Sequence, residues 1–303
     1  MIRSDPEIKE KGNNVMKKLF CLMLALAMLL LSATCLADAD TEETVLRVGT
    51  NPEFPPFEYV GDSGEIEGID VEIINAIAAD LGMTVQMEAM DFDALVPSLV
   101  SGKLDVAIAG MTITEDRKNS VLFSEPYFDA TQVVILREDS DINTVEDLAG
   151  KKVGVQLGTT GDLMMSEPEY GVGEVSRYNK AMDAALDLQN GRLDAVVIDT
   201  LPARQFVLSL DGLIMRDDIL KDAPVESYGI AVPMGQEELV EKINDSLERM
   251  MEDGTFDAIL VKYVESEEAE ESADATIEAA TDDTVAAPTE EPEAAAEEPS
   301  EAE

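Results

Sequence analysis

The sequence predicts an α/β fold built from two similar lobes. Strand patterns alternate with helix patterns along the middle of the chain, which predicts mainly parallel sheets flanked by helices. The segment Ser101 to Gly110 has a counterpart 89 positions later, Asn190 to Asp199, and each copy ends a helix at a glycine and begins a buried strand. A second pair of strands, Val45 to Thr50 and Lys152 to Val155, opens the two halves. The alternative explanation is a chance likeness between common helix–glycine–strand junctions.

The first half begins with a strand over 46–50 and a loop, Asn51 to Pro56, whose prolines exclude a helix. A helix follows, in which Asp70 is placed as the N-cap and Gly82 ends the last turn. The remaining elements predicted for this half are a strand over 84–88, a helix over 92–100 and a strand over 105–109.

The C-terminal part contains a predicted strand over 225–233, an amphipathic helix over 237–250 and a short amphipathic element over 255–264. Residues 265–303 hold 16 acids and no base, without apolar periodicity. This composition cannot form a packed surface, so we expect an acidic, disordered tail.

Composition excludes several classes of function. The net charge of −44, from 65 acids and 21 bases, argues against binding nucleic acid or anionic lipid. The cysteines, Cys21 and Cys35, both lie in the N-terminal apolar segment, and the chain has no histidine. We therefore expect no internal disulfide, no metal site, no cofactor and no histidine-dependent catalysis. A carboxylate- or lysine-based enzyme remains open.

The N-terminus carries the pattern of a signal peptide. Lys17 and Lys18 precede an apolar run from Leu19 to Leu31, then small residues and acids. A retained membrane anchor needs roughly 20 apolar residues, more than this run supplies. Cys35 could carry a lipid, but its lipobox is atypical, and we favour ordinary cleavage after Ala37 or Ala39. Met16 is an alternative start to Met1.

The junction from Gly110 to Arg117 predicts an anion site. It runs from a buried strand into a helix start at Thr114, where free backbone N–H groups lie beside the hydroxyl of Thr112. The guanidinium of Arg117 can bind a carboxylate through two parallel hydrogen bonds. The structural alternative is that Thr114 only caps the helix and that Arg117 lies on its surface.

The second half offers complementary groups. Backbone N–H groups at Gly158 to Gly161, with Thr160, can bind the same carboxylate. Asp199 ends the repeated strand and can bind an ammonium, although aspartate also serves as a turn or cap residue at such places. Phe54 and Phe92 lie beyond strand ends and could sandwich a side chain or belong to the core. These groups predict a zwitterion site in a cleft between the lobes.

The chain resembles the polar amino acid-binding proteins of ABC importers, family 3 of the bacterial extracellular solute-binding proteins. The resemblance covers roughly Val45 to Val264 and is carried by Val48–Tyr59, Gly68–Glu72, Gly110–Arg117, Phe123–Tyr127 and Gly154–Thr160. It implies the two-lobed periplasmic-binding-protein-like fold of type II, with two hinge crossings, near 129–133 and 227–230. It also implies which residues contact the bound amino acid. Its carboxylate would meet Arg117, Thr112 and Thr160, and its α-ammonium would meet Gly110 and Asp199. Phe54 and Phe92 would flank its side chain, and Asn51 and Gln156 would contact the end of that side chain.

The predicted organisation has five parts: an N-terminal extension with signal peptide (1–37), a linker (38–44), a first lobe in two segments (45–130 and 227–264), a second lobe (131–226) and the tail (265–303). The resemblance implies a monomer that takes a free L-amino acid to a membrane permease, on the periplasmic or extracellular face of the cell envelope. Asn51 stands where members selective for basic amino acids often have aspartate, which counts against a cationic ligand, although Glu53 is adjacent. The competing functions are a dehydratase of a cyclic carboxylate on the same fold and a ligand-sensing domain.

Overall fold

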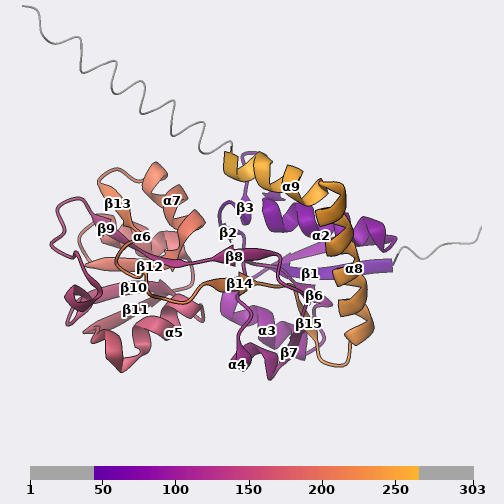
Figure 1. Cartoon of the computed structure of the whole chain (residues 1–303), viewed down its shortest axis with the longest axis horizontal. Coiled ribbons are helices and arrows are strands. Elements are labelled where there is room, and N and C mark those ends of the chain that lie inside the picture. Colours follow the sequence, from indigo (N-terminus) through magenta and orange to yellow (C-terminus); the bar gives the residue numbers. More distant parts are fainter. Residues whose placement is uncertain (1–43, 266–303) are drawn as a thin grey trace, which may run out of the picture. The chain divides into compact units, whose positions relative to one another are not determined.

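The computed structural model describes residues 44–265, which lie within a compact unit that begins at Thr44. The predictions for the signal peptide, Cys35, the linker up to Glu43 and the tail beyond Glu265 lie outside the described residues. Within them, the structure contains two five-stranded sheets, each flanked by helices (Figure 1).

Each sheet is mixed, because one strand runs against the other four. The opposing strand is β15 in the first sheet and β9 in the second. The first sheet has the order β5 (Met83–Ala89), β1 (Thr44–Thr50), β6 (Val106–Ala107), β15 (Ala231–Pro233), β7 (Val121–Phe123). The second has the order β11 (Glu174–Tyr178), β10 (Lys152–Gln156), β12 (Ala195–Asp199), β9 (Gln132–Arg137), β13 (Leu213–Arg216).

The two sheets have the same plan. The repeated strands occupy the same places, since β1 and β10 lie second in their sheets and β6 and β12 lie third. The strand that runs against its neighbours lies fourth in both. The internal similarity predicted from the sequence is therefore a similarity of lobes, not a chance likeness of junctions.

The chain crosses between the lobes twice, through β8 (Phe128–Ala130) and β14 (Glu226–Tyr228). These strands pair antiparallel, with Asp129 opposite Ser227, and lie side by side between the two sheets in Figure 1. The predicted strand over 225–233 is thus two strands, because the pairing is interrupted at Gly229 and Ile230, between the hinge pair and the first sheet. The chain packs closely at this interruption, since a Cβ on Gly229 would lie 2.8 Å from the Ile113 side chain.

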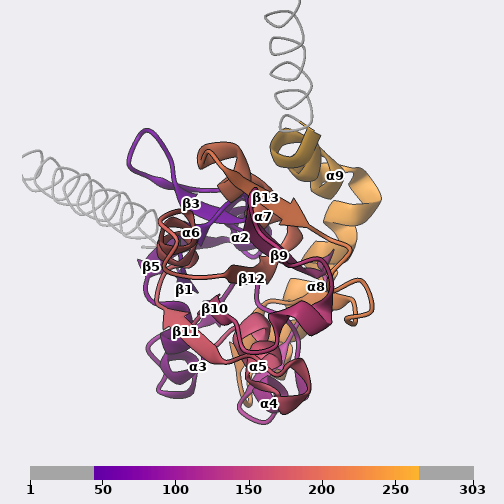
Figure 2. The same ribbon diagram turned by 90° about the vertical axis from the view of Figure 1, so that its left-hand side faces the viewer.

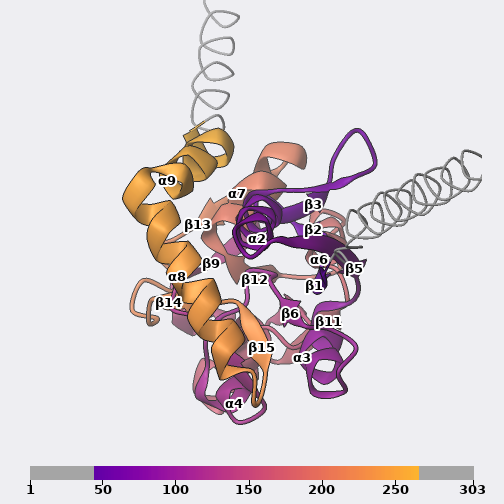
Figure 3. The same ribbon diagram turned by 90° about the vertical axis from the view of Figure 1, so that its right-hand side faces the viewer.

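Helices cover both faces of each sheet. The second sheet lies between α6 and α7 on one face and α5 on the other (Figure 2), and the first lies between α2, α8 and α9 on one face and α3 on the other (Figure 3). The helices are α2 (Ile69–Asp80), α3 (Phe92–Val100), α4 (Glu115–Lys118), α5 (Thr160–Ser166), α6 (Ala181–Gln189), α7 (Thr200–Ser209), α8 (Glu237–Asp253) and α9 (Thr255–Leu260).

Short elements complete the chain. They are the small antiparallel sheet of β2 (Glu53–Phe54), β3 (Glu58–Val60) and β4 (Ile66–Glu67), the 3-10 helices η1 (Val145–Leu148) and η2 (Pro168–Tyr170), and the π-helix η3 (Val261–Glu265). Strand alternation explains the division of the core. On β9, Val133 and Ile135 pack towards α6 and α7, whereas Val134 and Leu136 pack on the opposite face.

Asp70 is not the N-cap of α2, contrary to the sequence prediction. The cap is Gly68, and Asp70 lies in the first turn with no exposed surface. Its carboxylate accepts hydrogen bonds from the Gly110 N–H and the Tyr127 hydroxyl. These contacts with distant residues, rather than helix capping, account for the buried position of Asp70.

Gly68 should be essential for stability. Its φ of 134° is accessible to glycine alone, and a Cβ would lie 2.2 Å from the Phe57 carbonyl oxygen. We expect Gly68→Ala to lower the free energy of unfolding by about 2 kcal/mol or more in urea denaturation. Gly82→Ala is the matched control, because φ there is also positive but a Cβ would meet nothing within 4 Å. An equal loss in both variants would contradict the steric argument.

Candidate functional site

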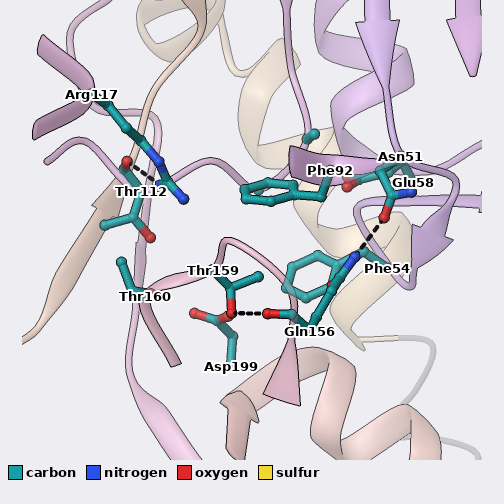
Figure 4. Close-up of a pocket in the computed structure, with 12 residues that line it drawn as sticks. Asn51, Phe54, Glu58, Phe92, Thr112, Arg117, Gln156, Thr159, Thr160 and Asp199 are labelled. Carbon is teal, nitrogen blue, oxygen red and sulfur yellow. Dashed lines mark hydrogen bonds between the residues drawn. The ribbon is translucent and has the colours of Figure 1, made fainter. Parts of the chain in front are cut away.

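A small cavity lies between the lobes, where the carboxyl ends of β1, β6, β10 and β12 meet. This is the edge at which open α/β sheets bind ligands. The structure brings all nine predicted site residues to its wall (Figure 4). They are Asn51, Phe54, Phe92, Gly110, Thr112, Arg117, Gln156, Thr160 and Asp199. Thr159, from the predicted segment Gly158 to Gly161, joins them, as do Glu58 and Ala109, which were not predicted.

Arg117 places a partly buried cation on one side of the cavity. Thr114 caps the short helix α4 by accepting from the Arg117 N–H, and the Arg117 side chain lines the cavity. The guanidinium donates to the Thr112 carbonyl at 2.6 Å and to the Gly158 carbonyl, in the other lobe, at 3.0 Å. Burial lowers the pKa of Arg117 to about 10, although the charges of Glu226 and Asp199 oppose the shift.

The Arg117 cation is stacked but lacks a carboxylate partner. Its guanidinium carbon lies 5.2 Å from the centre of the Phe92 ring, within cation–π range. No acid among residues 44–265 forms an ion pair with it. The structural alternative is therefore correct for Thr114, which caps the helix, but wrong for Arg117, whose side chain lines the cavity instead of lying on the helix surface.

Glu226 lies at the hinge side of the cavity and was missed by the sequence analysis. This carboxylate, on β14, accepts hydrogen bonds from the hydroxyls of Thr112 at 2.8 Å and Thr160 at 2.7 Å. The two threonines belong to opposite lobes, so one carboxylate joins them. No sequence signal could identify Glu226, because its strand lies more than a hundred residues from Thr112.

Asp199 supplies a second carboxylate at the end of β12. It is buried and accepts from the Gln132 amide at 3.0 Å. Burial, assisted by the charge of Glu226, raises the pKa of Asp199 to about 7. Asp199 stands at the N-cap position of α7 without a side-chain capping bond, so its carboxylate is free of the turn role considered above.

Gly110 brings backbone close to the cavity, and buried acids surround it. A Cβ at Gly110, where φ is +50°, would lie 2.8 Å from the Phe54 ring, so only glycine fits. Its N–H is held by Asp70, whose pKa burial raises to about 6. Glu58 is fully buried, and burial next to Asp70 and Asp199 raises its pKa well above the usual range.

Polar and aromatic side chains form the end of the cavity away from Glu226. The Gln156 amide donates to the Asn51 side-chain oxygen at 2.8 Å, and Asn51 donates to the Met90 carbonyl at 2.9 Å. This amide pair joins the lobes across the cleft, as Figure 4 shows. The sequence left open whether Phe54 lines the cavity or belongs to the core. The structure shows both, because Phe54 is buried on β2 and also lines the cavity.

Glu53 interacts with a residue of the second lobe. It forms an ion pair with Lys180, so it is not the free acid that could compensate for Asn51. A nearby bond from the Asn179 amide to the Asp91 carboxylate, at 3.0 Å, also crosses the cleft. These contacts close the rim next to Asn51 and Gln156.

Residues 46–266 match the family model of the bacterial extracellular solute-binding proteins, family 3. The chain belongs to this family. It is 36% identical to a probable histidine-binding protein of Neisseria gonorrhoeae over 260 residues, which cover 83% of this chain and 97% of that protein. It also resembles a mutant of ArgBP from T. maritima (45% identity, TM-score 0.69, covering 75% of this chain and 97% of that one). A third relative is an ancestral arginine-binding protein bound to glutamine (44% identity, TM-score 0.68, covering 73% and 97%).

Family membership confirms the resemblance drawn from the motifs, and the solved relatives confirm the two-lobed α/β fold. The family consists of solute-binding proteins, which confirms a binding protein over an enzyme and gives the dehydratase reading no support. It also implies a periplasmic or extracellular location. In residues 44–265, no helix has the length and apolarity needed to span a membrane, and no group of three or more acidic side chains could hold a metal ion.

The buried acid Asp199 should make stability depend on pH. Its folded pKa of about 7 exceeds the unfolded value of about 3.9, so the folded protein binds the extra proton and loses stability as pH rises between these values. Asp199→Asn removes this loss and keeps the oxygen that accepts from Gln132. We expect the variant to match the wild type at pH 4 and to be more stable by about 2 kcal/mol or more at pH 8, measured by urea denaturation. A constant difference across this range would contradict the assignment.

Proposed function

We propose that this chain is the exported substrate-binding component of an ABC importer, which takes up a free polar L-amino acid between its lobes. The observation that carries the proposal is the partly buried guanidinium of Arg117, which forms no ion pair with an acid in residues 44–265 and faces Asp199 across one cavity. A cation and a carboxylate fixed on opposite sides match the two charges of an α-amino acid.

The ligand carboxylate is assigned to Arg117 with the hydroxyls of Thr112 and Thr160, and the α-ammonium to Asp199 with the backbone at Gly110. Because the Gly110 N–H already donates to Asp70, its carbonyl is the group left for the ammonium. Phe54 and Phe92 would flank the side chain, and the Asn51–Gln156 amide pair would meet its polar end.

We further propose that the site favours a cationic amino acid. Where the pH is high enough to ionise Asp199, Asp199 and Glu226 outnumber Arg117 among the charged groups at the cavity, so their combined potential attracts a net positive ligand. Two similar proteins support this, since one is named for histidine and the other for arginine, although the second holds the neutral amino acid glutamine. In this proposal, the uncharged side chain of Asn51 neither favours nor disfavours a cationic amino acid.

The proposal also includes delivery of the bound amino acid to a membrane permease. Closure about β8 and β14 would enclose the amino acid, and the closed monomer would dock on a membrane permease. The segment up to Ala37 or Ala39 would direct export as a signal peptide, with Cys35 the alternative attachment point for a lipid.

A ligand screen tests this function. Thermal unfolding should be measured with each of the twenty amino acids, cystine and citrulline, since a ligand at 100 times its Kd adds about 2.7 kcal/mol of stability. We expect arginine to raise the melting temperature more than citrulline, its neutral isostere. Equal shifts would refute the cationic preference while leaving the zwitterion site intact. The absence of any shift would refute amino acid binding.

Arg117→Ala should weaken amino acid binding by about 100-fold or more, because it removes the charge that pairs with the ligand carboxylate in a buried site. Isothermal titration gives the affinity, and circular dichroism should show an unchanged fold, since the guanidinium has no ion-pair partner in the described chain to lose. Arg192→Ala is the control, because Arg192 pairs with Asp187 on the exposed surface. Undiminished binding by Arg117→Ala would refute the assigned orientation.

A further inference from the structure

The carboxylate of Glu226 occupies the two hydroxyls that the proposed function assigns to the ligand. Its Oε2 atom accepts from Thr112 at 2.8 Å and from Thr160 at 2.7 Å, and the side chain is almost completely buried. Gln132 lies at the edge of this group, with its amide 3.5 Å from the same oxygen. The arrangement is that of a bound carboxylate, except that it is attached to the protein's own chain.

A simple count of hydrogens limits what these hydroxyls can do. A threonine hydroxyl carries one hydrogen, so it donates to one acceptor at a time. Thr112 and Thr160 can therefore donate to Glu226 or to a ligand carboxylate, but not to both. Charge repulsion adds to this limit, because two carboxylates sharing one site cannot both remain ionised at low cost.

Position in the fold links this competition to the hinge. Glu226 lies on the crossing strand β14, opposite Ala130 of β8, while Thr112 and Thr160 belong to the first and second lobes. The carboxylate thus connects both lobes to the strand about which they would rotate. Releasing it frees the lobes from this connection.

We propose that Glu226 is an intramolecular competitor for the carboxylate of the amino acid, and that it must release Thr112 and Thr160 when the amino acid binds. This inference rests on the proposed function, because it needs those hydroxyls to bind ligand. Competition of this kind lowers the apparent affinity for the amino acid, because only the molecules in which Glu226 has released Thr112 and Thr160 can bind it. It also favours ligands that carry a carboxylate strong enough to displace it.

The opposite role is that Glu226 stays in place and accepts the ligand ammonium together with Asp199. The two roles differ in sign. Removal of a competitor strengthens binding of an amino acid, whereas removal of an ammonium acceptor weakens it.

Isothermal titration of Glu226→Ala with L-arginine and with agmatine, the same molecule without its carboxylate, separates these roles. We expect arginine to bind about tenfold more tightly than to wild type, as for loss of one competing charge-assisted bond, and agmatine to bind no more tightly. Glu226→Gln keeps the size of the side chain but forms weaker neutral bonds, so its affinity for arginine should lie between those of the wild type and Glu226→Ala. This variant also guards against a folding defect in the alanine variant. Weaker arginine binding by both variants overturns the proposal.

Asp129→Asn is the matched control, because Asp129 is an exposed carboxylate of the same hinge pair that bonds Ser227 instead of the cavity threonines. It should leave arginine affinity unchanged. Small-angle scattering without amino acid gives a readout that does not depend on ligand: Glu226→Ala should increase the radius of gyration relative to wild type, and Asp129→Asn should not. Failure of wild type to bind any amino acid would refute the proposed function, whereas an unchanged radius refutes the link through Glu226.

Discussion

The antiparallel pairing of β8 with β14 places the two lobes face to face. Because Asp129 lies opposite Ser227, the chain leaves the first lobe and returns to it along the same line. Each crossing then continues as the strand that runs against its neighbours, β9 in one sheet and β15 in the other. Both sheets consequently turn their carboxyl edges towards one cavity, where side chains that are remote in sequence meet.

Charge is concentrated in this cavity far from the solvent that would normally stabilise it. Glu58, Asp199 and Glu226 line or border it together with Arg117, and burial shifts the pKa of Asp199 upward and that of Arg117 downward. Buried charges without partners are costly, so such an arrangement carries a stability penalty that a ligand of opposite charge can offset. The site is organised for binding rather than for stability.

The contacts that cross the cleft fall into two groups. Near the hinge, Glu226 connects Thr112 with Thr160, and at the far rim Asn51 meets Gln156 while Glu53 meets Lys180. Only the first group uses donors that the proposed function assigns to the ligand carboxylate. Under that proposal, selectivity for the head group and the energetics of closure depend on the same hydroxyls.

The sequence by itself determined the lobe plan and the wall of the cavity. Alternating strands and helices, the repeated junctions and the loop motifs predicted β1, β6, β10 and β12, and all nine predicted site residues line the cavity, because strand ends and the loops after them are local features. It could not place Asp70, which looked like a cap, or identify Glu58 and Glu226, and it read β14 and β15 as one strand. Those outcomes depend on which distant groups share a low-dielectric space, and only the tertiary structure decides that by bringing a hinge carboxylate to threonines from both lobes.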